Sequence, residues 1–188
     1  MRKIILASQS PRRRELLKDI VEDFTVIPSD APEIVDKDVK AEDIPAILSL
    51  RKALDVAKNH TDDVVIGADT VVVIDSKVLN KPKDDDEAFE MLRMLSDREH
   101  KVITGCAIVC GDKKVSFSVT TKVQFFELSD REISEYIKTG DCADKAGAYG
   151  VQSFGKTLVK GICGDYFNVV GLPVAVLKRE LDAFLASL

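Results

Sequence analysis

The sequence predicts a mixed α/β fold in which helices flank a central β-sheet. Segments with strand-like apolar runs alternate along the chain with segments whose apolar residues recur at helical spacing. At least two pairs of neighbouring strand segments are joined by turns short enough for antiparallel pairing. The chain has 188 residues and no internal repeat or linker. We therefore expect residues 1–188 to form a single α/β domain.

Composition excludes several classes of protein. The chain carries 27 Lys and Arg against 32 Asp and Glu, a formal net charge of −5, and 45% of its residues are hydrophobic. The apolar content argues against disorder, and the acidic balance argues against a dedicated nucleic-acid-binding domain. No apolar run approaches the length of a membrane span, and the N-terminus lacks the features of a secretory signal. We expect a cytoplasmic protein that binds neither nucleic acid nor membrane.

The N-terminal third contains the first predicted elements. A short buried strand is expected at 3–7, and a helix follows because Ser10 suits the N-cap and Pro11 the first helical position. A second short strand is expected at 24–28. The next helix is expected at 44–60, with its buried stripe formed by Ile47, Leu50, Leu54 and Ala57. Lys52 lies off that stripe, and pattern alone makes it a surface lysine.

The middle of the chain predicts strands and tight turns. Residues 64–74 form an apolar, β-rich run, and Asp75-Ser76 is a turn that returns the chain to residues 78–79. Asp84 is expected to cap a helix whose apolar face is formed by Ala88, Met91, Leu92 and Leu95. Segments 102–109 and 115–125 predict a hairpin across Gly111-Asp112.

The C-terminal third contains two further helices separated by a glycine-rich segment. Ser129 and Glu132 form a capping box at the start of the first helix, and Pro173 begins the second. Seven of the ten glycines lie from Gly140 to Gly171. None of the glycine spacings fits a Walker A loop or a dinucleotide fingerprint, which disfavours a kinase or a Rossmann dehydrogenase. The four cysteines lack the paired spacing of a zinc site.

Three segments contradict the structural preferences of their surroundings, as functional sites often do. The first is residues 8–14, where three arginines occupy the first turn of a helix, an end that favours negative charge. Arginines and free backbone N–H groups together predict an anion site. The alternative is a solvated basic turn that pairs with nearby acids such as Glu15.

The second segment is Gly67-Ala68-Asp69-Thr70. Asp69 is the one carboxylate in the apolar run 64–74, and burying a lone carboxylate is costly unless it is paired or binds a metal. We interpret Asp69 as a metal ligand or general base at a strand end, with Gly67 and Ala68 leaving room for a ligand. The alternative is a turn residue with a hydrogen-bonded carboxylate.

The third segment is 144–153. Its small residues let the backbone approach a ligand, Lys145 offers a charge, and the amide of Gln152 can recognise a base edge. A run of tight turns is the competing interpretation.

Taken together, segments in order along nearly the whole chain resemble the Maf family of nucleoside triphosphate pyrophosphatases, also called septum formation inhibitor proteins. The matching segments are LASQSPRRRELL (6–17), GADTVV (67–72), KP (81–82), LSDREH (95–100), DKAGAYGVQ (144–152) and YFNVVGLP (166–173). Each segment alone is weak evidence, whereas their joint occurrence in this order is specific.

The resemblance implies a fold, a reaction and an assembly. The fold is a central mixed sheet flanked by helices, with two lobes around a deep cleft, similar to the inosine-triphosphate pyrophosphatases. The reaction is cleavage between the α- and β-phosphates of a nucleoside triphosphate, which yields the monophosphate and pyrophosphate. It requires a divalent cation: Mg²⁺, with Mn²⁺ or Co²⁺ as alternatives. The resemblance also implies a homodimer that controls nucleotide pools, with a link to septum formation in some members.

The resemblance also implies roles for individual residues. Asp69 takes the place of the proton acceptor, and Arg12, Thr70 and Gln152 take the specificity positions in a combination that resembles the branch acting on dTTP and UTP. The polar residues that line the phosphate end of the cleft are Ser8, Arg13, Lys52 and Lys81. Glu33 matches a family acid that could help Asp69 hold the metal. Ser153 departs from the family, in which glycine is common after the glutamine.

Two other functions compete with this hypothesis. One is a nucleotide-binding regulator of cell division with little turnover, and the other is a phosphohydrolase that releases orthophosphate. Asp69 and Lys81 argue against a pure binding protein, because binding alone needs no group that activates water.

Overall fold

The computed structural model describes residues 2–36 and 38–188 and confirms the mixed α/β fold. The described chain forms a seven-stranded sheet in the order β2-β1-β3-β5-β6-β7, with β4 paired to β3 off this path. The strands are β1 (Ile4–Leu6), β2 (Thr25–Val26), β3 (Val64–Ile74), β4 (Lys77–Leu79), β5 (Glu99–Cys110), β6 (Lys113–Phe125) and β7 (Val159–Cys163). β1 is parallel to β2 and β3, and all the other pairs are antiparallel.

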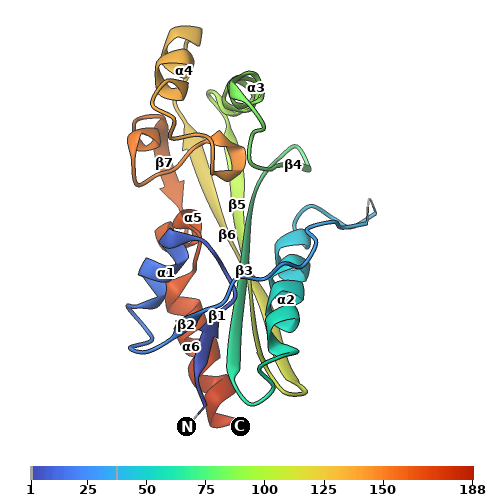
Figure 1. Ribbon diagram of the computed structural model, residues 1–188. Helices are drawn as coiled ribbons and strands as arrows, with labels where there is room; N and C mark the ends of the chain where they lie inside the picture. Colours follow the sequence, from blue (N-terminus) through green and yellow to red (C-terminus); the bar gives the residue numbers. More distant parts are fainter. Residues whose placement is uncertain (1, 37) are drawn as a thin grey trace.

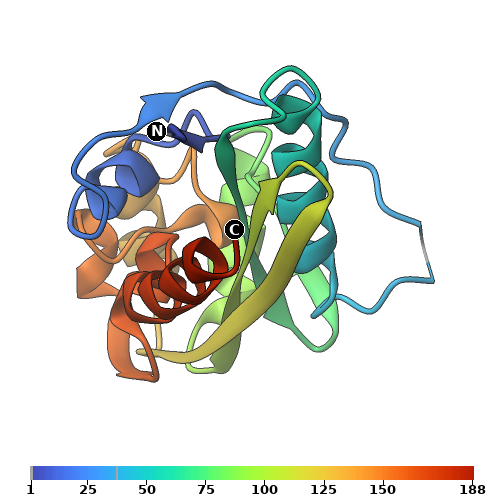
Figure 2. The same cartoon turned by 90° about the horizontal axis from the view of Figure 1, so that it is seen from below.

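Helices cover both faces of the sheet (Figures 1 and 2). Helices α1 (Pro11–Leu17), α5 (Tyr166–Val170) and α6 (Val174–Ala186) lie on one side, and α2 (Ile44–Ala57) lies on the other. Helices α3 (Asp85–Leu95) and α4 (Asp130–Ile137) lie at the end of the sheet opposite the chain termini. β4, β7 and the 3-10 helices η1 (Ala146–Ala148) and η2 (Phe154–Thr157) lie toward the same end. The long strands β3, β5 and β6 thus join two lobes.

Local sequence signals explain where most helices begin. The Ser10 hydroxyl accepts a hydrogen bond from the Arg13 amide at the start of α1, and the Asp84 carboxylate does the same for the Glu87 amide at the start of α3. The capping box of α4 is formed as predicted, with Ser129 and Glu132 each bonding the other's backbone amide. These caps satisfy N–H groups that have no partner within the helix.

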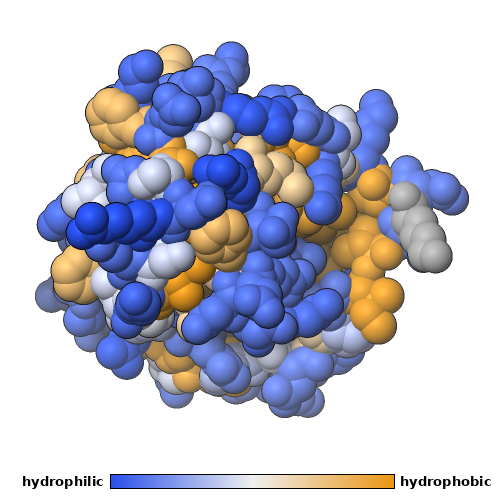
Figure 3. Space-filling model, turned by 90° about the horizontal axis from the view of Figure 1, so that it is seen from above, coloured by the Kyte–Doolittle hydropathy of each residue, from blue (hydrophilic) through white to orange (hydrophobic). Residues whose placement is uncertain are grey.

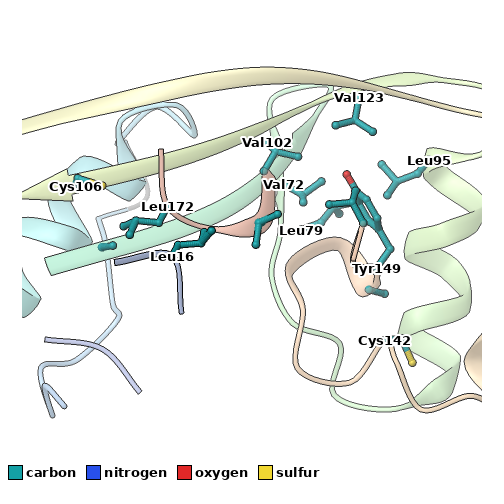
Figure 4. Packing of buried hydrophobic residues seen from close by; sticks show 14 of the residues in the cluster. Leu16, Val72, Leu79, Leu95, Val102, Cys106, Val123, Cys142, Tyr149 and Leu172 are labelled. Carbon is teal, nitrogen blue, oxygen red and sulfur yellow. The ribbon is translucent and has the colours of Figure 1, made fainter. Parts of the chain in front are cut away.

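One hydrophobic cluster extends through both lobes. Figure 4 shows its two ends, with Leu16 and Leu172 at one and Leu95, Tyr149 and Cys142 at the other. Separate clusters, including Ala53, Val56 and Val65, lie between α2 and the sheet. Polar residues cover most of the face in Figure 3, with hydrophobic residues in separate patches. No described helix is both long and apolar enough to span a membrane.

The predicted stripe of the 44–60 helix is correct only in part: Ala57 is buried and Leu50 packs against the core, but Leu54 does not. Helix α2 ends at Ala57 and buries Pro45, Leu48, Ser49, Ala53, Val56 and Ala57, whereas Leu54 is exposed. Small residues replace the expected large ones because α2 approaches the sheet very closely. A Cβ at Gly67 would lie 2.2 Å from the Ser49 carbonyl oxygen, and one at Gly105 would lie 2.2 Å from that of Pro45. The space expected for a ligand at Gly67 is therefore filled by α2.

Candidate active site

A gap along one edge of β3 determines where the site lies. On that edge β3 pairs with β1 over Val64–Ile66 and with β4 over Val72–Ile74. Residues 67–71 between them face no strand there, while the other edge pairs continuously with β5. Unpaired backbone groups need other partners, and the Ala68 carbonyl accepts a hydrogen bond of 2.9 Å from Arg13 Nη1. The predicted arginine cluster and the predicted Asp69 segment therefore meet at this gap.

Arg13 is held by neutral oxygens. Its Nη1 also donates to Ser8 Oγ (3.3 Å), its Nη2 to Thr70 Oγ1 (2.9 Å) and its Nε to the Gly171 carbonyl (2.9 Å). Burial lowers the pKa of the guanidinium, and the nearby Asp69 carboxylate opposes that change. Arginine remains charged at any pH the protein encounters. Within 2–36 and 38–188, Arg13 forms no direct ion pair, so its charge is available to an anion.

Asp69 lies in the middle of β3 and not at a strand end as expected, because β3 continues to Ile74. Its side chain contacts a lysine of α2. Lys52 Nζ donates to Asp69 Oδ1 at 2.7 Å and lies 2.6 Å from Glu33 Oε1. The close approach of α2 at Gly67 places Lys52 over Asp69, because residues two apart in a strand share a face. The Lys52 side chain is only 14% exposed, which contradicts its interpretation as a surface lysine.

The surroundings of Asp69 suit a proton acceptor. The residue is 7% exposed. Burial raises the pKa of its carboxyl, while the charges of Lys52 and Arg13 act in the opposite direction. The net pKa lies above the ordinary value, closer to neutral pH, where a general base is most effective. Asp69 is thus held beside two cations and still able to take up a proton.

A chain of hydrogen bonds through two threonine hydroxyls connects Arg13 to Asn168. The sequence patterns did not predict this chain. Thr70 Oγ1 lies 2.9 Å from Thr104 Oγ1, which donates to the Asn168 carbonyl at 3.0 Å. The Asn168 side chain bonds the Thr104 amide, the Val102 carbonyl and Thr121 Oγ1. Asn168 is fully buried. A lone amide in the apolar run 166–172 was the available signal, since buried polar side chains need partners.

The remaining predicted residues lie around this cluster with fewer contacts. Arg12 Nη1 pairs with Asp144 Oδ2 at 3.0 Å, which joins α1 to the glycine-rich segment. Lys81 is exposed after β4. The pKa of Glu33 is lowered mainly by its hydrogen bond with Lys52, and the charge of Lys81 contributes a smaller effect.

Gln152 is exposed and forms no side-chain hydrogen bond with the other site residues described. Lys145, expected to face a ligand, instead pairs with Asp141 and Asp144.

The two carboxylates fit a divalent cation only in part. Asp69 and Glu33 direct oxygens to a single point, which the Lys52 ammonium occupies. The described chain contains no group of three or more His, Cys, Asp or Glu side chains arranged for a metal. Mg²⁺ is commonly held by one or two carboxylates together with water and substrate phosphates. The donor set therefore suits a cation that arrives with a phosphorylated ligand.

The chain is similar to known proteins along nearly its whole length. Residues 3–184 match the family model described as Maf-like protein. The chain is 47% identical over 184 residues to the dTTP/UTP pyrophosphatase of Bacillus cereus (strain B4264), covering 98% of this chain and 96% of the relative. It is 48% identical over 185 residues to the dTTP/UTP pyrophosphatase of Clostridioides difficile (strain 630), covering 97% and 95%.

A solved structure shows the same fold at low sequence identity. The Staphylococcus aureus Ham1 protein aligns with a TM-score of 0.59 and 16% identity, over 97% of this chain and 99% of that one. At this identity the likeness concerns the fold alone. It confirms the predicted arrangement of a mixed sheet with flanking helices.

Proposed function

This chain belongs to the Maf-like protein family, and we propose that it hydrolyses nucleoside triphosphates, with dTTP and UTP preferred, to the monophosphate and pyrophosphate. The observation that carries the proposal is the buried Asp69 carboxylate beside Lys52 and near Arg13, at a gap in the sheet edge. The full-length similarity to dTTP/UTP pyrophosphatases supports the choice of substrate.

The proposed reaction follows from the charges in the site. Asp69 accepts a proton from water, whose oxygen forms a bond to the α-phosphorus. The bond from that phosphorus to the bridging oxygen breaks, and pyrophosphate leaves with the electron pair. Negative charge grows on the leaving group, and Arg13, Lys52 and Lys81 can stabilise it. Ser8 and Arg13 meet at the end of β1, and we assign both to the phosphate chain.

Arg12, Thr70 and Gln152 are proposed to determine which nucleotide is accepted. Arg12 and Gln152 keep donor groups at the surface of the site, where a base or ribose can reach them. The Thr70 hydroxyl lies between Arg13 and Thr104. Its contribution to specificity therefore includes the orientation of the Arg13 guanidinium.

A divalent cation is part of the proposal. Asp69 and Glu33 would hold Mg²⁺, or Mn²⁺ or Co²⁺, together with phosphate oxygens of the substrate. When bound, the cation neutralises phosphate charge and makes water more acidic. Lys52 contacts both carboxylates and would have to share them with the cation. Lys52 thereby keeps the two carboxylates close together before substrate arrives.

We further propose that the protein acts in the cytoplasm as a homodimer. Phe126 and Phe154 are 50% and 61% exposed, so both are available for contact with a second copy. Light scattering coupled to size-exclusion chromatography measures the oligomeric state directly. A monomer at micromolar concentration would contradict this part of the proposal.

The test is a panel of nucleoside triphosphates with Mg²⁺ or Mn²⁺, in which pyrophosphate and orthophosphate are measured separately. We expect pyrophosphate from dTTP and UTP, and a loss of about 10²- to 10⁴-fold in Asp69→Asn, the usual contribution of a general base. Nucleotide binding, measured by calorimetry, should persist. Asp112→Asn makes the same change at an exposed turn and serves as the control.

Each alternative function predicts a different result from this panel. Orthophosphate as the first product would identify a different phosphohydrolase. Binding without turnover under either metal would favour a nucleotide-binding regulator. Wild-type turnover by Asp69→Asn would show that the catalytic assignment is wrong.

A further inference from the structure

We propose that Asp141 is a positioning residue for nucleotide selection, because its carboxylate fastens residues 141–155 into the shape that presents Arg12 and Gln152 to the substrate. This inference rests on the proposed function and extends it to a residue outside the cluster around Asp69. Asp141 follows α4 and precedes the glycine-rich segment.

Both oxygens of the Asp141 carboxylate are used within the protein. Oδ1 pairs with Lys145 Nζ at 3.0 Å. Oδ2 accepts hydrogen bonds from Ser153 Oγ, from Tyr136 Oη at 3.2 Å and from the Gly155 amide at 3.4 Å. The side chain is 11% exposed. One carboxylate therefore joins the end of α4 to both the beginning and the end of the segment.

Lys145 transmits this attachment to Arg12. Its ammonium donates to the Asp141 carbonyl at 2.7 Å and to Asp144 Oδ1 at 2.7 Å, in addition to the Asp141 carboxylate. Asp144 Oδ2 in turn pairs with Arg12 Nη1 at 3.0 Å. Arg12 and Asp141 are thus connected through two intervening side chains. Loss of the Asp141 charge would free Lys145 to shift and would alter the partner of Arg12.

Two glycines let the segment close around Lys145. A Cβ at Gly150 would lie 2.5 Å from Lys145 Cδ and Cε, so the lysine chain occupies the space that a side chain would need. A Cβ at Gly155 would lie 2.6 Å from the Gly150 carbonyl oxygen. The loop carrying Gln152 is therefore closed at its base, where Gly150 and Gly155 touch. Asp141 bonds this same base through Ser153 and the Gly155 amide.

Asp141→Asn is a sharp test because it keeps the size of the side chain and removes its charge. Burial raises the pKa of Asp141, but hydrogen bonds from Ser153 and Lys145 outweigh that effect, so the net pKa is lowered and the wild-type residue is ionised near neutral pH. Asp182→Asn is the matched control. Asp182 also pairs with a lysine four positions away, Lys178, but on the exposed face of α6.

The experiment compares kcat and KM for dTTP and GTP in the wild-type, Asp141→Asn and Asp182→Asn proteins. We expect Asp141→Asn to raise KM for dTTP about tenfold and to leave kcat within about threefold, since positioning of the base mainly affects binding. The preference for dTTP over GTP in kcat/KM should fall by about fivefold or more. Hydrogen exchange across 141–155 should become faster, and Asp182→Asn should change none of these quantities.

Several outcomes would overturn the proposal. Unchanged KM and unchanged preference in a folded Asp141→Asn protein would do so, as would a fall in kcat alone. If Asp141→Asn does not fold, Ser153→Ala removes one of the carboxylate's contacts and keeps its charge. That variant should shift KM, preference and hydrogen exchange in the same direction by a smaller amount, and no shift would count against the proposal.

Failure of the proposed function is distinguishable from failure of this inference. If the wild-type protein releases no pyrophosphate from any triphosphate, the proposed function is wrong. Hydrogen exchange across 141–155 still measures whether Asp141 holds the segment. Unchanged exchange in Asp141→Asn then overturns the inference independently.

Discussion

Arg12 and Arg13 are neighbours in α1, but the protein holds them by different means. Arg13 donates to backbone carbonyls and hydroxyls on or beside β3 and after α5. We call the residues gathered around the middle of β3 the strand-held region (Ser8, Arg13, Lys52, Asp69 and Thr70). Arg12 is held by a carboxylate of the loop-held region (Arg12 and residues 141–155). The first region depends on the sheet, and the second depends on ion pairs within a loop.

This difference suits the two tasks we propose. Neutral acceptors orient Arg13 without cancelling its charge, which is useful where phosphate charge must be stabilised. Asp144 neutralises Arg12 in part, and the Arg12–Asp144 pair is exposed enough to exchange partners when substrate binds. Positions on strands are held more precisely than positions on loops. Changes in the strand-held region should therefore affect the chemical step, and changes in the loop-held region should affect selection.

Among the variants that test this comparison, Arg13→Lys in the strand-held region is expected to lose the most activity. Lysine keeps the charge, but it cannot reproduce the fork that reaches Ala68, Thr70 and Gly171. We expect kcat/KM for dTTP to fall about 10²-fold, chiefly through kcat, and unfolding free energy to fall by about 2 kcal/mol. Steady-state kinetics and urea denaturation measure the two effects.

Arg14→Lys is the control for that prediction, because Arg14 is the exposed neighbour in the same helix. Near-wild-type activity in Arg13→Lys would mean that charge alone matters at this position. The comparison between the two arginines would then lose its basis.

A smaller effect on activity, with a larger effect on stability, is expected from Gly67→Ala, which tests how Lys52 reaches Asp69. The new methyl group would meet the Ser49 carbonyl and the Ala53 amide of α2 at 2.2 and 2.9 Å, so the helix must move away from β3. We expect a loss of about 3 kcal/mol in stability, the upper end of the usual cost of overpacking, together with weaker hydrolysis. Gly161→Ala, where nothing lies within 4 Å, is the matched control. Equal melting temperatures for the two variants would contradict the close approach.

The smallest effect on activity at neutral pH is expected for a pH-sensitive contact that attaches the loop-held region to the sheet. The Nε2 atom of His100, on β5, lies 2.7 Å from Tyr149 Oη. The Nδ1 atom of His100 has no hydrogen-bond partner in the described structure. Burial lowers the pKa of His100 from 6.5 to about 4. The unfolded chain therefore binds this proton first as the pH falls. The contribution of neutral His100 to the free energy of unfolding is complete above pH 6.5. It is lost between pH 6.5 and about 4, at up to about 1.4 kcal/mol per pH unit.

Urea denaturation at several pH values checks this prediction. His100→Gln should flatten the dependence of the unfolding free energy on pH between pH 6.5 and 4. An identical slope in wild type and His100→Gln would show that other groups carry the acid sensitivity.

Much of the fold could be predicted because its signals are local. The apolar run that forms β3, the turn at Asp75-Ser76, the caps at Ser10 and Asp84 and the capping box at Ser129 all depend on residues a few positions apart. The buried face of α3 was predicted correctly for the same reason. The stripe of α2 was predicted only in part, because the glycines that bring α2 close lie on strands far along the chain.

The sequence by itself determined most of the element types, the family and the residues that contradict their surroundings, but it did not predict β7 or α5. Only the tertiary structure decided which of those residues act together. Arg13 bonds a carbonyl 158 positions away, and Lys52 joins Asp69 to Glu33 across the packing of α2 on β3. Local preferences arise from neighbouring backbone geometry, whereas such contacts depend on how strands pair and how closely a helix can approach them.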